Sequence, residues 1–304
     1  MNFGLIIIGD EILSGKRADK HLAKAIEILS ARGLSVAYAD YVGDDPLRIT
    51  ATLRRAMASG DVVFSFGGIG ATPDDHTRQC AAAALGVELA LHPDAKRLIL
   101  ERMQDIAREQ GLPYEPERSD NQHRLNMGMF PLGASIIPNP FNKIPGFSCF
   151  GEPRPEWERG THGGSQFSDG PPQGKLAPSG GSDPHAVGER GGIHFLPGFP
   201  VMAWPMVEWV LDTHYAAYFS KNAWREQSVI VFGAMEATLT PLMQSIEAGF
   251  AVKVFSLPSV DHPEYGRHVE LGVKGRPEVV SEAFLALKQG LKLLAATLGP
   301  ELVR

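Results

Sequence analysis

The first part of the chain alternates short apolar runs with amphipathic segments. Residues 3–8 form a near-continuous apolar run, and residues 34–41 and 61–66 have the character of further strands. Runs of this kind are typical of strands whose two faces are both buried. Apolar residues at helical spacing, together with helix start and stop signals, predict helices at 22–29, 46–57, 75–85, 93–109 and 201–219. This alternation predicts an α/β domain with three layers, in which helices cover both faces of a mostly parallel sheet.

Residues 151–191 have a different composition. The segment is rich in Gly, Pro, Ser and charged residues, and beyond alanine its only aliphatic residues are Leu176 and Val187. It cannot bury enough apolar area to offset an ordering entropy of roughly 1–2 kcal/mol per residue. We expect a long disordered insertion within the first domain. Long structureless segments are either linkers or functional lids, and the sequence leaves both interpretations open.

A second pattern begins near residue 226. It predicts strands at 228–232, 251–257 and 268–273, and a helix at 236–246. A last helix is expected from the apolar spacing of Phe284, Leu287, Leu291, Leu294 and Leu298. We therefore divide the chain into a domain at 1–220 and a small α+β unit at 226–304.

Charge and composition narrow the choice of partners. The formal net charge of −6 argues against nucleic acid as a partner. Cys80 and Cys149 are too few for a disulfide framework or a cysteine zinc site. The first ten residues lack the basic start of a signal peptide, and their apolar run is too short to span a bilayer. We expect a cytoplasmic protein that does not associate with membranes.

The strongest local signal is the glycine-rich turn that follows residues 62–66. Gly67, Gly68 and Gly70 allow a tight turn and let a ligand approach the backbone closely. Successive N–H groups in such a turn can face one anion, and the start of a following helix adds partial positive charge. Thr72 can contribute a hydroxyl group. The turn lacks the lysine of a P-loop. The alternative is that the turn is only a tight connection.

Acidic residues follow three strands. Asp74 and Asp75 come after the glycine turn, and helix capping would explain only one of them. A second carboxylate beside bound phosphates requires a cation, a role that suits Mg²⁺. Asp10 and Glu11 follow the first strand, with Ser14 and Gly15 after them, and Asp44 and Asp45 follow the second. Asp45 before Pro46 is expected to be a helix cap. Because the carboxyl ends of parallel strands meet at one edge, the three loops together predict a metal-assisted or ribose-contacting site.

Five segments, in order, resemble the molybdopterin-binding family. The branch is the one found at the amino end of competence/damage-inducible protein A. The segments are residues 8–15, 42–45, 67–75, 138–147 (similar to the second glycine loop of that branch) and 196–200 (similar to its Pro-Gly-x-Pro turn). Residues 226–300 resemble the small KH-type segment that follows in those proteins. The resemblance does not include the nicotinamide-mononucleotide deamidase domain that often comes next.

The resemblance implies a function and a set of site residues. It implies metal-dependent cleavage of a nucleotide diphosphate such as ADP-ribose to AMP and ribose phosphate, with Asp44 and Asp75 as catalytic residues and ligands of a divalent metal such as Mg²⁺. It also implies a homo-oligomer. The alternative is a non-catalytic module that binds molybdopterin or its nucleotide. The residues expected to bind the small-molecule nucleotide or pterin are Gly9, Asp10, Glu11, Ser14, Gly15, Gly67, Gly68, Gly70, Thr72, Asp74, Pro145, Gly146, Pro197 and Gly198.

Three further features have competing interpretations. Residues 141–144 replace a stretch of small residues in the second loop, which is expected to narrow or alter the pocket. Residues 272–275 match the Gly-x-x-Gly pattern of RNA-binding loops, but we place them at the end of a strand and do not expect RNA binding. Trp204, Met206 and Trp209 can wall a ligand ring, but their spacing favours ordinary helix packing.

Overall fold

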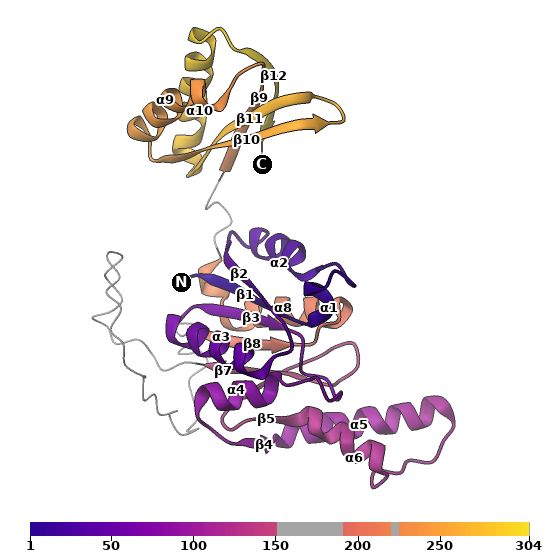
Figure 1. Cartoon of the computed structure of the whole chain (residues 1–304). Helices are drawn as coiled ribbons and strands as arrows, with labels where there is room; N and C mark the ends of the chain where they lie inside the picture. Colours follow the sequence, from indigo (N-terminus) through magenta and orange to yellow (C-terminus); the bar gives the residue numbers. More distant parts are fainter. Residues whose placement is uncertain (151–190, 220–224, 304) are drawn as a thin grey trace, which may run out of the picture. The chain divides into compact units, whose positions relative to one another are not determined.

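The computed structural model describes residues 1–150, 191–219 and 225–303. The chain divides into two compact units, Met1–Phe219 and Ser220–Arg304 (Figure 1). The expected insertion lies outside the described residues except for Gly191.

A six-stranded sheet forms the centre of the first unit, in the order β2-β1-β3-β8-β7-β6. Neighbours are parallel from β2 to β8, whereas β7 is antiparallel to β8 and β6 is antiparallel to β7. The prediction of a mostly parallel sheet is confirmed. The strands are β1 (Phe3–Ile8), β2 (Val36–Val42), β3 (Val62–Phe66), β6 (Ser135–Ile137), β7 (Gly146–Phe150) and β8 (Gly192–Leu196), and β4 (Leu89–Leu91) pairs with β5 (Met129–Pro131) in a separate ladder.

Helices cover both faces of this sheet, as the alternation of side chains on β1 shows. Leu5 and Ile7 belong to one apolar cluster with residues of α2 and α8, and Ile6 and Ile8 belong to another with residues of α3 and α4. The strand is apolar throughout because each of its faces packs on a helix layer. The helices are α1 (Asp10–Leu13), α2 (His21–Ser30), α3 (Pro46–Ser59), α4 (Thr77–Leu85), α5 (Pro93–Gln110), α6 (Ser119–Leu125) and α8 (Pro200–His214) (Figure 1).

Two expected helix boundaries are wrong. Helix α4 begins at Thr77 instead of residue 75, because the glycine turn continues through Asp75, which folds back onto Thr72. Helix α8 ends at His214 instead of running to residue 219, and a 3-10 turn at Ala216–Tyr218 follows it. The chain leaves helical geometry at Tyr215, whose side chain is fully buried.

The second unit has four strands and two helices. The sheet order is β10-β11-β9-β12, and all neighbours are antiparallel. Residues of both helices pack with residues of the sheet in one apolar cluster. The elements are β9 (Arg225–Phe232), α9 (Glu236–Gly249), β10 (Val252–His262), β11 (Gly266–Gly275), α10 (Pro277–Leu293) and β12 (Thr297–Val303).

The last strand is absent from the sequence prediction, which extended the final helix to Leu298. Helix α10 ends at Leu293, Ala295 adopts a left-handed conformation, and Leu298 lies in β12. Leu298 packs on the same apolar cluster as α10, which is why its position fitted the helical spacing. Residues 272–275 lie in β11, as predicted, and pair there with both β9 and β10. None of the helices in the described ranges is long and apolar enough to cross a membrane.

Candidate functional site

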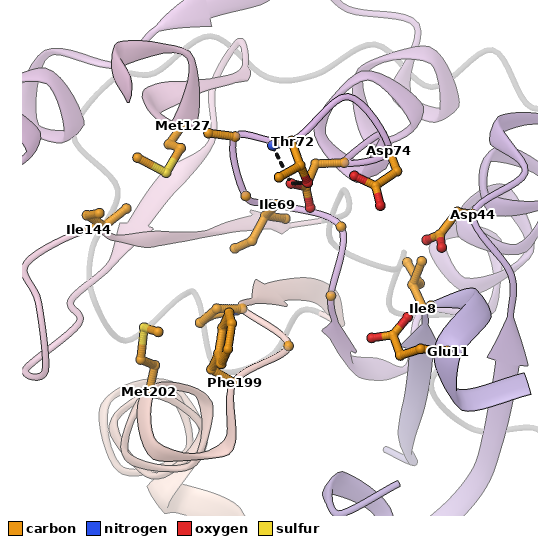
Figure 2. Close-up of a pocket in the computed structure, with 18 of the residues that line it drawn as sticks. Ile8, Glu11, Asp44, Ile69, Thr72, Asp74, Met127, Ile144, Phe199 and Met202 are labelled. Atoms are coloured by element: carbon orange, nitrogen blue, oxygen red, sulfur yellow. Dashed lines mark hydrogen bonds between the residues drawn. The ribbon is translucent and has the colours of Figure 1, made fainter. Parts of the chain in front are cut away.

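A cavity of about 770 Å³ lies beyond the carboxyl ends of β1, β2, β3 and β8 (Figure 2). Loops from distant parts of the sequence form its wall, as expected for the ligand edge of a parallel sheet. The expected site residues that line it are Gly9, Glu11, Asp44, Gly67, Gly68, Gly70, Thr72, Asp74, Asp75, Pro145, Pro197 and Gly198.

Four expected site residues do not line this cavity. Asp10 instead ties two loops together: its amide donates to Asp44 Oδ2 at 2.9 Å, and its Oδ1 accepts from the amide of Asp44 at 3.2 Å. Ser14 follows the last residue of α1, and Gly15 adopts a left-handed conformation beside it. Gly146 is the first residue of β7, where a Cβ atom would meet the carbonyl of Phe195. The expectation that Gly146 belongs to a loop is therefore wrong.

The glycine turn is held through its carbonyl groups. The amide of Thr77 donates to the carbonyl of Gly68 at 3.0 Å, and the Thr77 hydroxyl donates to that of Gly67 at 3.1 Å. Buried Arg78 donates to the carbonyl of Ile69. Within the described parts of the chain, the amides of residues 68–71 donate to no acceptor. These four residues all line the cavity, which makes their N–H groups candidate donors to a ligand.

Two residues of this turn require glycine. Gly67 and Gly68 have φ values of 100° and 69°, which L-residues with a side chain rarely adopt. A Cβ atom would also meet the carbonyl of Ile8 at Gly67 and the hydroxyl of Thr77 at Gly68. The turn is therefore a specific backbone structure.

Two of the three acidic loops were considered as sources of helix caps, and only one of them provides a cap. Asp75 Oδ2 accepts hydrogen bonds from Thr72, and His76 precedes α4, so the interpretation of Asp74 or Asp75 as a helix cap is wrong. Asp45 caps α3 by accepting from the amide of Leu47 at 2.9 Å, which confirms that prediction.

The surroundings of Asp44 raise the pKa of its carboxyl group. Burial raises its pKa, and the negative charges of nearby Asp10, Glu11 and Asp74 raise it further, against a lowering hydrogen bond from the amide of Asp10. A bound cation would relieve this accumulation of negative charge. Among the described residues, however, no three His, Cys, Asp or Glu side chains are grouped to hold a metal ion. The side chains of the described residues therefore do not form a complete cation site by themselves.

The opposite end of the cavity is apolar. Figure 2 shows Met127, Ile144, Phe199 and Met202 at this end, away from Glu11, Asp44 and Asp74. Asn139 and Asn142 shape it from the loop before β7: Asn139 Nδ2 donates to Asn142 Oδ1 at 2.8 Å and to the carbonyl of Ile144 at 2.9 Å. Of these side chains, only Asn142 and Ile144 lie in the stretch that was expected to narrow or alter the pocket. The unusual composition of residues 141–144 was the available signal.

Lys16 and Arg17 also line the cavity and were not anticipated. Both are exposed, and neither forms an ion pair with a carboxylate of the described residues. They directly follow Ser14 and Gly15, so a basic pair beside the first acidic loop was the signal in the sequence. Two unpaired cations beside a turn with free amides favour an anionic ligand.

The Pro197–Gly198 turn is held by a buried histidine. His21 Nε2 lies 3.1 Å from the carbonyl of Gly198, and its ring stacks on Phe66 with centroids 4.3 Å apart. Burial lowers the pKa of His21, which favours a neutral ring that donates its Nε2–H to that carbonyl. Trp204, Met206 and Trp209 pack in the core and do not line the cavity, which confirms their interpretation as helix-packing residues.

The chain is similar in sequence to one known protein family and to individual known proteins. A sequence model of the family described as "probable molybdopterin binding domain" matches residues 4–216. A CinA-like protein of Anaeromyxobacter sp. (strain Fw109-5) is 35% identical over 144 residues, which are 47% of this chain and 33% of that protein. A CinA-like protein of Desulfovibrio desulfuricans is 31% identical over 153 residues, 50% of this chain and 33% of that protein. The matched region thus spans about a third of these relatives.

Among solved structures, the crystal structure of the protein CinA from Thermoplasma acidophilum is similar to this chain. Its TM-score is 0.48 at 24% sequence identity, and the match covers 70% of this chain and 98% of that one.

Proposed function

The chain belongs to the molybdopterin-binding domain family, and from that premise we propose that its first unit hydrolyses a nucleotide diphosphate such as ADP-ribose with the help of a divalent cation. The products would be AMP and ribose 5-phosphate. One P–O bond of the diphosphate bridge breaks, and water supplies the oxygen and the protons.

One observation supports the phosphate-binding part of this proposal above all. Residues 68–71 line the cavity, and their amides donate to no acceptor in the described chain. Because an unpaired amide is costly once a ligand excludes water, these groups favour a ligand that brings several acceptor oxygens. A diphosphate does so. Lys16 and Arg17 would neutralise part of its charge.

The acidic residues fit a cation that is held jointly with the ligand. Mg²⁺ typically binds through one or two carboxylates together with substrate phosphates, so a group of three protein ligands is not required. Asp44 and the Asp75 oxygen that Thr72 leaves free are the proposed ligands. The chemistry that a cation supplies in such sites is polarisation of a phosphoryl oxygen and a lowered pKa of the attacking water. The turn amides would meanwhile hold the phosphate and stabilise the charge that develops on its oxygens.

The proposal is tested by incubating the purified protein with ADP-ribose and a panel of divalent metals, and measuring AMP release. Asp44→Asn should lose metal-dependent release. Asp45→Asn is the matched control: it makes the same charge change one residue away, at a helix cap where Asn serves equally well. Release from wild type and Asp45→Asn but not from Asp44→Asn supports the proposal. Absence of release from folded wild-type protein contradicts it.

A second candidate function is a module that binds a pterin or nucleotide without turnover. Two observations favour it. One oxygen of Asp75 already accepts a hydrogen bond from Thr72, and no group of three metal-binding side chains occurs among the described residues. This candidate predicts that binding persists in the presence of a metal chelator and that no AMP is released. Calorimetric titration with a phosphorylated pterin and with ADP-ribose, with and without the chelator, distinguishes the two functions.

A further inference from the structure

Phe199 is an exposed aromatic residue on a rigid backbone. It lies between Gly198 and Pro200, the first residue of α8, and its carbonyl accepts from the amides of Met202 at 3.0 Å and Ala203 at 2.9 Å. The preceding residue is held by the contact between His21 and the Gly198 carbonyl. Although its backbone is fixed in this way, 58% of Phe199 is exposed. The ring is thus presented to the cavity instead of packing in the core.

Three other segments bring apolar side chains to the same end of the cavity. Met127, Ile144 and Met202 come from the turn after α6, the loop before β7 and the first turn of α8 (Figure 2). Each is half-buried. Methionine thioethers make favourable contacts with ring systems and adapt to their shape. A phenyl ring together with these side chains forms a surface suited to a flat, weakly polar group.

This surface adjoins the phosphate-binding turn. A Cβ atom built on Gly198 would lie 3.5 Å from Gly67 Cα, so the Pro197–Gly198 turn is packed against the start of the glycine turn. Phe199 is the next residue along the chain. A ligand with phosphate on the amides of residues 68–71 therefore has the Phe199 surface nearby on one side and the acidic residues on the other (Figure 2).

We propose that Phe199 is a specificity-determining residue that stacks on a planar heteroaromatic ring of the ligand, with Met127, Ile144 and Met202 around that ring. The inference rests on the proposed function, since the phosphate site fixes which end of the ligand the ring occupies. The purine of a nucleotide and a pterin share the flat, polarisable face that stacking requires.

The test uses the full chain, with Phe141 as a matched control. Phe141 is 59% exposed and does not line the cavity. Phe199→Ala should weaken AMP binding about tenfold, within the range measured for a stacked base. Binding of ribose 5-phosphate, which has phosphate but no ring, should not change. Phe141→Ala should leave both affinities unchanged. Phe199→Trp should restore AMP binding. The tryptophan fluorescence that this variant adds to that of wild type should be quenched by AMP or by a pterin. The fluorescence added by Phe141→Trp should not be quenched.

The outcomes separate this inference from the proposed function. Equal loss of AMP and ribose 5-phosphate affinity in Phe199→Ala, or no loss of either, overturns the stacking role while phosphate binding stands. Adenosine and an unphosphorylated pterin are titrated as ring-only probes. Their quenching of Phe199→Trp supports the stacking role even if no phosphate compound binds, and a complete lack of quenching overturns it. Whether purine or pterin binds more tightly identifies the ring that the site prefers.

Discussion

The carboxylate of Asp75 folds back onto Thr72, accepting from its amide at 2.8 Å and from its hydroxyl at 2.6 Å. The amide of Asp75 donates in turn to the carbonyl of Thr72 at 3.0 Å. These bonds close the loop that begins at the glycine turn. Asp75 therefore has a structural role in addition to the cation-binding role that we propose for its other oxygen.

Two substitutions at Asp75 separate these roles. Asp75→Asn keeps an oxygen that can accept from Thr72, so the turn and its affinity for pyrophosphate should remain while metal-dependent AMP release is lost. Asp75→Ala removes the acceptor as well, and should also weaken pyrophosphate binding by up to about thirtyfold, because two hydrogen bonds worth roughly 1 kcal/mol each are lost. Calorimetry and the AMP assay measure both effects. Release at the wild-type rate from Asp75→Asn would show that Asp75 only closes the turn.

Gly68→Ala should abolish ligand binding because of its effect on the glycine turn. The substitution places a side chain at a φ of 69° and against the hydroxyl of Thr77. Gly86→Ala is the control: Gly86 has a φ of 70°, has open space around its Cα, and ends α4 away from the cavity. Both variants should lose about 1–2 kcal/mol of stability from the left-handed conformation. Pyrophosphate titrations and urea unfolding compare them, and wild-type affinity in Gly68→Ala would contradict the role of this turn.

The basic pair should contribute charge-dependent affinity. Lys16→Gln and Arg17→Gln are each expected to weaken pyrophosphate binding about tenfold, as for loss of one hydrogen bond to a charged group. Each variant should also make the affinity less sensitive to salt, because exposed charges are screened. Lys20→Gln, at an exposed lysine that does not line the cavity, should change neither property. If Lys20→Gln weakened binding as much as Lys16→Gln, the effect would reflect net charge alone.

A buried polar network makes stability depend on pH. His194 is fully buried, its Nδ1 lies 2.8 Å from Ser148 Oγ, and its Nε2 lies 2.9 Å from the Tyr215 hydroxyl. Burial, with a smaller contribution from His214, lowers the pKa of His194 from 6.5 to about 3. The folded chain therefore keeps this ring neutral at pH values where the unfolded chain protonates it.

The free energy of unfolding should fall as the pH drops from about 6.5 towards 3, because the unfolded state then binds one more proton. The contribution of His194 is complete above pH 6.5 and its slope approaches 1.4 kcal/mol per pH unit. Urea unfolding of wild type and His194→Gln at several pH values isolates this slope, and His123→Gln, at an exposed histidine, is the control. Equal slopes in wild type and His194→Gln would contradict the assignment.

The sequence predicted those parts of the fold that depend on local patterns. Leu5, Ile6, Ile7 and Ile8 are apolar because two helix layers bury the faces of one strand, and this pattern is visible without coordinates. Strand β12 was missed because Leu298 continues the spacing of α10 and packs on the same cluster. Because Leu298 contacts the same apolar residues as α10, the spacing of apolar positions does not show that the helix has ended before it.

The site was predictable where backbone conformation requires a residue type. Gly67 and Gly68 adopt conformations that favour glycine, so they stood out in the sequence. Phe199 and Met127 did not, because apolar residues in a sequence are expected in the core and only the folded chain brings them to one cavity. The hydrogen bonds between Asp75 and Thr72 likewise depend on the path of the turn, which spacing alone does not define.

The most direct test of the glycine turn as the phosphate site is an amide NMR titration of nitrogen-15-labelled protein with pyrophosphate and with ADP-ribose. The signals of Gly68, Ile69, Gly70 and Ala71 should shift with both ligands at the same concentrations, while that of Gly86 should not. Saturable binding that leaves the four turn amides unshifted would contradict the assignment of this turn as the phosphate site.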